Sequence, residues 1–423
     1  MDRLSLSPPM NGVAEVTLIG GPHGYGESVV IHLGNGEWIV VDSCVDPSTK
    51  ECLPLLYLNK IGVDIEKNLR YVICTHWHSD HIAGLSQLIE KCSSDVVFVL
   101  SCAEDREKTA YEFASNYDYT GKSKVLKELT DTFTLVSNKK IKVKRVEQDK
   151  LIFRIGKVQC FALSPSEFEV RQFETNLAGA MNRYLKLFDE IYKKNQNALQ
   201  IIEEAEDIQQ EFYESIEQRM DEKGTDENVV TETIRDLNEF KDANKVDKNN
   251  RCVAMLISFG SHHVVLGADL EVSCLDSGWH SVLNCECMHS VKANMLKIPH
   301  HGSKTGYLRE FLTQHIEPQA TAKLSTWIAG SRTLPKADVL KDYYKHTTNL
   351  FITNDNLLRY KNTEEDRSIR KIMDEKTEEI IEVVPRLGVI QSRIQIDSDC
   401  DEWKTEVFGS ATKLTDSMLQ FLV

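Results

Sequence analysis

This sequence has neither a long apolar run nor an excess of basic residues. No stretch of about 18 consecutive apolar residues occurs, and residues 1–9 lack the apolar core of a secretory signal. The lack of a long apolar run and of a signal core predicts a cytosolic protein that does not contact a membrane. The net charge of −15 argues against a large basic surface for duplex nucleic acid, because contacts with phosphates supply most of the non-specific affinity. The same charge is compatible with a small phosphate-bearing substrate held by a metal ion, or with nucleic acid presented by a partner protein.

The cysteine spacing of a small disulfide-rich domain is also missing. The 11 cysteines are scattered through the chain, which predicts free thiols. One close pair, Cys285 and Cys287 with His289 nearby, could bind a metal ion, although ordinary structural cysteines are the simpler interpretation of a single pair. The hydrophobic content of 41% over 423 residues is enough to bury a large core, in one elaborated domain or in two.

Three histidines and an aspartate stand within six residues, directly after the apolar run at 71–74. Imidazoles and a carboxylate crowded at the mouth of a buried strand need partners, and a divalent metal ion is a partner for all of them. His76 and His78 lie on one side of an extended segment, because side chains repeat every two residues, so both can bind one ion. Asp80 and His81 follow and can bind a second ion. Nitrogen ligands with a carboxylate suit zinc, manganese or iron better than calcium or magnesium.

This segment resembles the His-x-His-x-Asp-His motif of the metallo-β-lactamase fold hydrolases. Three further segments extend the resemblance: the apolar strand that ends at Asp42, the strand that ends at Asp269, and the His-His-Gly motif at 300–302. The resemblance implies an α/β fold, a four-layer αββα sandwich, in which Asp42 braces the metal loop and Asp269 bridges the metal ions. The last motif, together with residues 24–28, is most similar to the branch that includes the hydrolase domain of the DNA-uptake competence protein.

His300 and His301 are adjacent, so strand alternation would send them to different sides, and only one is expected to bind metal. His301 looks more like the family ligand because Gly302 follows it, and His300 would then contact the substrate or move a proton. The opposite assignment stays open on sequence grounds. The catalytic candidates are Asp80, His300 and Asp42, and the metal-ligand candidates are His76, His78, Asp80, His81, Asp269 and His301.

One motif of the family has no counterpart here. Most relatives carry a histidine between the metal loop and the bridging aspartate, as the third ligand of the first metal ion. The corresponding stretch is 158–166, which contains no histidine, and His262 lies too close to Asp269 to fill that role. We therefore expect the first site to be held by His76, His78 and Asp269 with water. One or two ions of zinc or manganese would bind per chain.

A long insertion divides the predicted core. Residues 1–166 are expected to form the first half of the core with the His-rich metal loop, 167–250 an acidic helical insertion, and 251–423 the second half with C-terminal strands. Apolar residues recur every three or four positions from 181 to 220, which is typical of a long amphipathic helix or a helical hairpin. Two interpretations stay open: the arm covers the rim of its own active site, or it forms an interface for a homodimer or a protein partner.

Local patterns predict most of the remaining elements. Alternating or continuous apolar residues predict strands at 13–19, 28–33, 38–41, 95–100 and 387–396, the last paired with 403–408 as a terminal hairpin. Helical periodicity predicts helices at 50–66, 82–92 and 337–344.

The predicted function is that of a metal-dependent hydrolase. A bound metal ion brings the pKa of its water near neutral and polarises the bond under attack, so a metal-bound hydroxide would be the attacking group. The resemblance to the competence branch favours phosphodiester bonds, as in a nuclease or a nucleotide phosphodiesterase, with single-stranded nucleic acid among the possible substrates. Two other classes compete: a binding or regulatory subunit of a larger assembly with a structural metal, and a lactone or thioester hydrolase.

Overall fold

The computed structural model describes residues 7–21, 24–103, 124–171, 249–329, 332–354, 387–396 and 402–420. Most of the predicted helical insertion at 167–250, and any interface formed through it, lies outside these residues. Within the described ranges, no helix is long and apolar enough to span a membrane.

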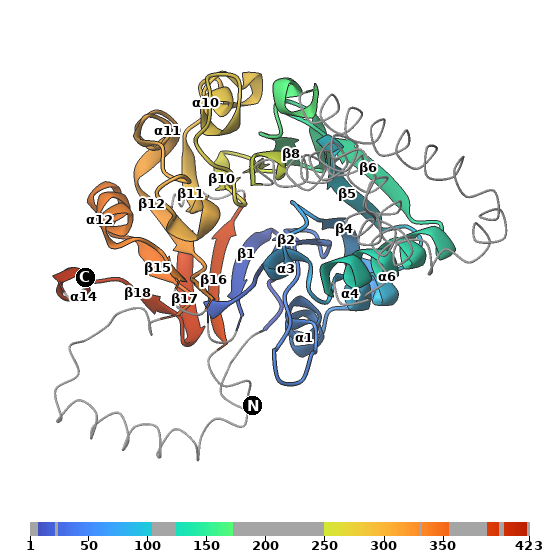
Figure 1. The fold of residues 1–423 in the computed structure, drawn as a ribbon. Helices are drawn as coiled ribbons and strands as arrows, with labels where there is room; N and C mark the ends of the chain where they lie inside the picture. Colours follow the sequence, from blue (N-terminus) through green and yellow to red (C-terminus); the bar gives the residue numbers. More distant parts are fainter. Residues whose placement is uncertain are drawn as a thin grey trace, which may run out of the picture.

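Two sheets, each of eight described strands, form the centre of the molecule (Figure 1). Their orders are β17-β16-β1-β2-β3-β4-β5-β6 and β18-β15-β12-β11-β10-β9-β8-β7, and β13 (Trp327–Ala329) pairs with β14 (Arg332–Leu334) as a separate ribbon. The first sheet contains β1 (Val13–Gly20), β2 (Glu27–Leu33), β3 (Trp38–Val41), β4 (Leu69–Ile73), β5 (Val97–Ser101), β6 (Lys142–Val146), β16 (Gly388–Gln395) and β17 (Lys404–Gly409). The second contains β7 (Leu151–Ile155), β8 (Val158–Ala162), β9 (Met255–Phe259), β10 (His262–Leu266), β11 (Ala293–Lys297), β12 (Ile316–Leu324), β15 (Leu350–Ile352) and β18 (Thr412–Lys413).

Helices cover the outer face of each sheet (Figure 1). The first sheet is covered by α1 (Leu53–Lys60), α4 (Leu85–Lys91) and α6 (Lys124–Asn138), and the second by α10 (Gly278–Val282), α11 (Arg309–His315) and α12 (Ala337–His346). Shorter helices are α2 (Ile65–Asn68), α3 (Ser79–Ile82), α14 (Asp416–Gln420) and the 3-10 turns η3 (Asn249–Arg251), η4 (Glu286–Met288) and η5 (Pro299–Gly302). The predicted αββα sandwich is confirmed.

Three apolar cores separate these four layers, because successive side chains of a strand point to opposite faces. In β3, Ile39 and Val41 face the other sheet, whereas Trp38 and Val40 face the helices α1 and α4. In β9, Met255, Ile257 and Phe259 join the core between the sheets, and Leu256 joins the core under α10 to α12. Strands buried on both faces therefore read as continuous apolar runs in the sequence.

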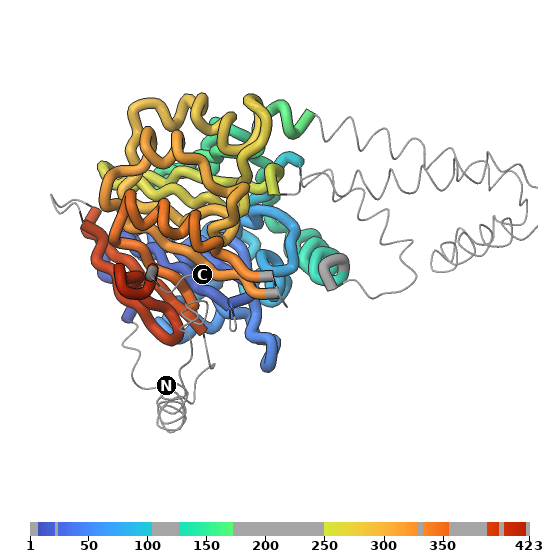
Figure 2. Tube along the Cα trace, turned by 60° about the vertical axis from the view of Figure 1, so that its left-hand side comes forward, coloured from blue at the N-terminus to red at the C-terminus, as the bar shows by residue number. Residues whose placement is uncertain are grey.

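The chain crosses between the two sheets more than once. After β6 it passes through a short turn into β7 and β8, which pair with β9 in the second sheet. Near its C-terminal end it returns to the first sheet, where β16 pairs antiparallel with β1 over eight residues (Figure 2). The predicted hairpin at the end of the chain is confirmed, since β16 also pairs antiparallel with β17.

Two predicted helices are interrupted. The segment 50–66 forms α1 and α2, which are separated by a turn at 61–64, and Asp64 begins α2 by accepting a hydrogen bond from the backbone N–H of Lys67. The segment 82–92 begins its regular helix only at Leu85, because Gly84 adopts φ 82° at the junction of α3 and α4. The second break directly follows the His-rich loop after β4.

Parallel pairing brings the carboxyl ends of several strands to one edge of each sheet. Strands β3, β4, β5 and β6 run parallel in the first sheet, and β10, β11, β12 and β15 run parallel in the second. The backbone N–H of Val253 donates to the carbonyl of Thr75, which joins the two edges at 3.0 Å. Ligand sites of open parallel sheets lie at such carboxyl ends.

We expect Phe259→Ala to lower the free energy of unfolding by about 3–5 kcal/mol, because it removes a ring buried between the sheets and leaves a cavity. The Phe259 ring is fully buried and its centroid lies 6.1 Å from that of Trp403. Urea denaturation measures the change. The matched control is Val407→Ala in β17, where the side chain is 37% exposed and the expected change is about 0.5 kcal/mol or less. Equal losses in both variants would contradict this placement of the core.

Candidate metal centre

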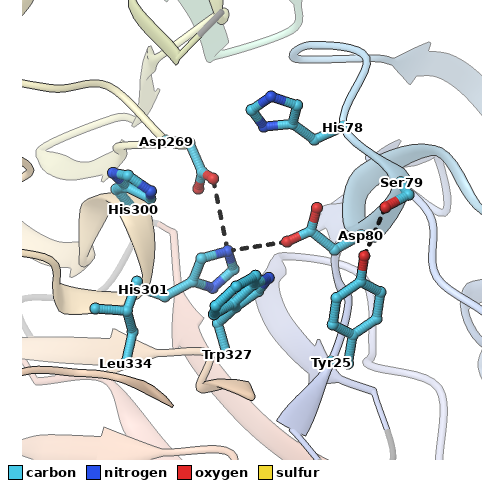
Figure 3. Close-up of a pocket in the computed structure, with 9 residues that line it drawn as sticks. All are labelled: Tyr25, His78, Ser79, Asp80, Asp269, His300, His301, Trp327 and Leu334. Carbon is cyan, nitrogen blue, oxygen red and sulfur yellow. Dashed lines mark hydrogen bonds and ion pairs between the residues drawn. The ribbon is translucent and has the colours of Figure 1, made fainter. Parts of the chain in front are cut away.

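Five of the sequence-predicted residues, His78, Asp80, Asp269, His300 and His301, line one cavity of about 300 Å³ between the carboxyl edges of the two sheets (Figure 3). The metal loop follows β4, Asp269 follows β10, and His300 and His301 follow β11. Aromatic and apolar side chains from other loops complete the walls. The residues that line the cavity are Tyr25, His78, Ser79, Asp80, Asp269, His300, His301, Trp327 and Leu334.

Asp42 holds the metal loop in place through hydrogen bonds. Its carboxylate accepts hydrogen bonds from the backbone N–H of Thr75 at 2.7 Å, from the Thr75 hydroxyl at 2.6 Å and from His81 Nδ1 at 2.8 Å. The same carboxylate therefore sets the backbone at the start of the loop and the ring of His81. Since Nδ1 of His81 is used in this contact, Nε2 is the atom left to face the cavity.

Two other histidines show the same pattern. His301 Nδ1 lies 3.0 Å from the hydroxyl oxygen of Ser325, and His76 Nδ1 lies 3.0 Å from that of Thr75. The Thr75 hydroxyl donates to Asp42 and the Ser325 hydroxyl donates to Glu27, so both oxygens accept from the imidazoles. Each ring is thus held by an N–H donor at Nδ1 and presents Nε2, which is the arrangement of metal-binding histidines.

Four side-chain atoms converge on one side of the cavity. Nε2 of His81 lies 3.3 Å from Asp269 Oδ2 and 3.9 Å from Asp80 Oδ2. Nε2 of His301 lies 3.5 Å from Asp269 Oδ2 and 3.4 Å from Asp80 Oδ2. Two imidazoles and two carboxylates at these separations make a ligand set of the kind that zinc and manganese bind.

A second set lies on the other side of Asp269. Ligand atoms of His76, His78 and Asp269 all lie within 4.8 Å of one another, and His76 Nε2 approaches His78 Nδ1 to 2.9 Å. Ser164, in the stretch where a third histidine was sought, does not join this set, because its hydroxyl donates to the carbonyl of Cys252 at 2.7 Å. His262 lies elsewhere, beside Asn294 and Trp403.

These residues fit a divalent cation on two grounds. Nε2 of His81, Nε2 of His301 and Oδ1 of Asp269 are buried and have no hydrogen-bond partner among the described residues, which is costly for polar atoms unless a cation contacts them. The charges also need compensation. Burial alone would raise the pKa of Asp80, but His81 and His301 lower it to about 2, so this carboxylate is charged at neutral pH.

The pKa values of the buried histidines shift in opposite directions. Burial lowers the pKa of His76 well below its usual range, and the neighbouring His81 and His78 lower it further, so His76 is neutral and ready to act as a ligand. For His301 burial also favours the neutral form, but the carboxylates of Asp269, Asp80 and Glu27 together outweigh it and raise the pKa to about 9. Without a metal ion, protons on His81 and His301 therefore compensate the carboxylates.

Sequence reasoning assigned no role to a buried ion pair behind the site. Lys297 Nζ lies 2.5 Å from Glu27 Oε1, 3.0 Å from the carbonyl of Ala268 and 3.9 Å from Asp269 Oδ1. Glu27 in turn contacts His301 Nδ1 at 3.5 Å. The Nδ1 side of His81 and His301 is already bonded, so Glu27 acts through Lys297 and Ser325 and orients the ligands. In the sequence, Glu27 stands in the glycine-rich segment 24–28 and Lys297 stands in an apolar run just before the His-His-Gly motif.

His300 occupies a different position from His301. Its Nδ1 lies 2.6 Å from Glu271 Oε1, and the ring lines the cavity without reaching the four-atom set (Figure 3). The structure therefore places His301 with Asp80 and Asp269, and His300 beside them.

The loops around the cavity hold unusual backbone conformations. Asp42, Ala268, His300 and His301 all adopt positive φ angles, of 58°, 43°, 42° and 50°. Such conformations cost about 1–3 kcal/mol each for residues other than glycine and persist only where the surrounding structure imposes them. Each of these residues follows β3, β10 or β11. The backbone strain is therefore concentrated in the loops that connect these strands to the site.

The two facing sheets with outer helices and a His-rich loop after β4 define the metallo-β-lactamase fold. Residues 21–98 match the family model described as the metallo-beta-lactamase superfamily, a segment that includes β2 to β4, the metal loop and the start of β5. Members of this superfamily are generally hydrolases that bind divalent metals, often zinc. The family model therefore supports the resemblance over residues 21–98.

Several solved structures are similar to this chain. The metallo-beta-lactamase fold protein YhfI from Bacillus subtilis is 13% identical, with 80% of this chain and 95% of that chain covered and a TM-score of 0.34. The metallo-beta-lactamase SMB-1 is 17% identical over 37% of this chain and 53% of its own, with a TM-score of 0.24. A metallo-beta-lactamase from Cronobacter sakazakii is 17% identical over 35% and 48%, with a TM-score of 0.22. No curated protein matches the sequence.

We expect Asp42→Asn to weaken binding of zinc by about 10–100-fold, because the charge that holds His81 Nδ1 is removed while the shape of the side chain is kept. Calorimetric titration of the metal-free protein measures the affinity. The control is Asp64→Asn at the start of α2, where a carboxylate that caps a helix is changed without touching the site. An unchanged affinity in Asp42→Asn would show that Asp42 does not orient a ligand.

The metal-free protein should lose stability as the pH rises from about 6.5 to about 9. The pKa of His301 is raised to about 9 in the folded state. Its contribution is therefore complete below the unfolded value near 6.5 and is lost as the pH passes through the folded value. Denaturation by urea at several pH values measures this loss, and His301→Ala should reduce the slope. With zinc present the trend should weaken or reverse, because binding displaces these protons; a flat metal-free profile would contradict the charge balance described above.

Proposed function

We propose that this chain is a metal-dependent hydrolase that binds two divalent ions, zinc or manganese. The proposal rests on the position of Asp269. Its Oδ2 lies within 4 Å of Nε2 of His76 in one set and of Nε2 of His81 and His301 in the other. His81, His301, Asp80 and Asp269 would hold one ion. His76, His78 and Asp269 would hold the other, with an open position where relatives have a third histidine.

A divalent ion held there would supply a Lewis acid that activates water and polarises the bond to be cleaved. Residues of the chain would orient the ligands, balance the charge and transfer protons. Asp42 and Ser325 orient His81 and His301, and Lys297 offsets the negative charge of Glu27 and Asp269. His300 lines the cavity and its Nδ1 faces Glu271 Oε1 at 2.6 Å, so its other ring nitrogen would be the one to give a proton to the leaving group or take one from water.

We favour phosphodiester bonds as the substrate class. Two ions a few ångströms apart suit in-line displacement at phosphorus. Tyr25 and Trp327 line the cavity with their ring centroids 6.2 Å apart, and aromatic walls of this kind stack bases. The resemblance of the His-His-Gly motif to the competence branch points the same way. A nucleotide or the end of a single strand is consistent with a cavity of about 300 Å³.

Two other functions stay in competition. A regulatory subunit with a structural metal is favoured by the missing third histidine and by the predicted acidic insertion at 167–250, which could also bind a partner or a second copy of the chain. A lactone or thioester hydrolase would use the same metal chemistry. We also propose a cytosolic location, since all ten cysteines of the described ranges are free thiols.

Hydrolysis of bis-nitrophenyl phosphate by the metal-loaded protein tests the proposal. We expect activity in the wild type and a loss of about 1000-fold in Asp80→Ala and in Asp269→Ala, because each removes several kcal/mol of charge stabilisation. Metal content per chain is measured in parallel, with about two ions expected in the wild type. The control is Asp338→Ala, an exposed carboxylate paired with Lys304.

The alternatives give different results in the same assay. Turnover of nitrophenyl esters or thioesters with no reaction of the phosphate would identify the second hydrolase class. Two results together would support a regulatory subunit. The metal-loaded protein would be inactive on both probes, and a partner-dependent phenotype would survive Asp80→Ala.

A further inference from the structure

A second cluster of ligand-type side chains lies apart from the cavity. The Sγ atoms of Cys285 and Cys287 and a carboxylate oxygen of Asp149 all lie within 4.8 Å of one another. The two cysteines flank the start of η4, whereas Asp149 belongs to the turn that joins β6 to β7. None of these residues lines the active-site cavity. The cluster therefore joins segments 136 residues or more apart in sequence and is independent of the proposed hydrolytic site.

Backbone and side-chain contacts hold the three groups in place. The backbone N–H of Cys287 donates to Asp149 Oδ1 at 3.0 Å, which fixes the carboxylate beside the two thiols. The side chain of Gln148 donates to Cys285 Sγ at 2.9 Å and to the carbonyl of Ser281 at 2.9 Å. N–H donors to sulfur are the contacts that stabilise a thiolate bound to a metal ion, since ligand atoms are themselves hydrogen-bonded.

The burial of the cluster leaves one side accessible. Cys285 is fully buried under α10, while Cys287 and Asp149 are partly exposed. A cation could therefore enter from solvent and keep one water molecule, with three ligands from the protein. Two thiolates and one carboxylate are too soft for magnesium or calcium and match zinc.

A divalent ion bound by this cluster would displace the protons of both thiols. On binding, both S–H bonds break, two sulfur–metal bonds form and two protons pass to water, so the net charge of the occupied site is −1.

We infer that Cys285, Cys287 and Asp149 form a structural zinc site that is separate from the hydrolytic centre. Its position gives it a mechanical role. The turn at 147–150 is where the chain leaves the edge of the first sheet and enters the edge of the second, and η4 belongs to the helical layer that covers the second sheet. A bound ion would fasten this crossover to that layer.

Cobalt(II) provides the probe, because a thiolate ligand gives a near-ultraviolet charge-transfer band that imidazole and carboxylate ligands do not. We expect the reduced full-length protein to show this band on titration with cobalt and to lose it on addition of zinc. Cys287→Ser should weaken cobalt binding at this site by about 100-fold or more and remove most of the band. Cys274→Ser, which changes an exposed cysteine of the same segment, should leave the band unchanged.

A second readout does not depend on the band. In an Asp80→Ala background, which disables the hydrolytic centre, zinc should raise the melting temperature, because a ligand that binds only the folded state stabilises it by mass action. The additional change Asp149→Asn should reduce this shift. Asp149 is partly exposed, so this variant is expected to fold.

Three results would overturn the inference. The first is the absence of a thiolate band in the reduced wild type, and the second is a band that survives in Cys287→Ser, which would place the thiolate ligand elsewhere. The third is a disulfide between Cys285 and Cys287 that persists under reducing conditions, detected as the loss of two hydrogens in the peptide that contains both residues.

Discussion

The charge balance around Asp269 is the constraint on which the rest of the site depends. Four carboxylates, those of Glu27, Asp42, Asp80 and Asp269, are at most 7% exposed, and each would be unstable in an apolar interior without partners. Lys297 and the protonated rings of His81 and His301 provide partners in the metal-free state. A bound metal ion would provide them in a loaded state. Folding and the proposed metal binding therefore draw on the same set of charges.

The fold supplies this arrangement through the direction of its strands. Because β3 and β4 are parallel, Asp42 and Thr75 lie side by side, and because β10 and β11 are parallel, Asp269 and His301 do so. The two sheets then bring these pairs together across the sandwich. Rigid strands set the positions, and the strained residues at their ends turn the side chains inward.

Much of this could be predicted from the sequence, because the strongest signals are local. The four candidate ligands of the metal loop lie within six residues, and Asp42 and Asp269 each end an apolar run. The roles of Glu27, Ser325 and Lys297 could not be predicted, since the contact between Glu27 and Ser325 joins residues 298 positions apart and depends on how the two sheets pack. Contrary to the expectation from sequence, strand alternation is not what separates His300 from His301. Residues 299–302 form a turn with positive φ angles, so the two rings diverge for a reason other than strand geometry.

The pairing of β1 with β16 has a consequence for how the chain folds. Val13 lies opposite Gln395, so the central region of the first sheet joins residues from nearly opposite ends of the sequence. A contact of such high sequence separation forms late, because the entropy of closing so long a loop must be overcome first. During synthesis, β1 and β2 would leave the ribosome long before β16 exists, and the edge of β1 would stay open to other strands until then. Early protection of that edge, by a chaperone or by transient pairing, is therefore a requirement that the topology places on the cell.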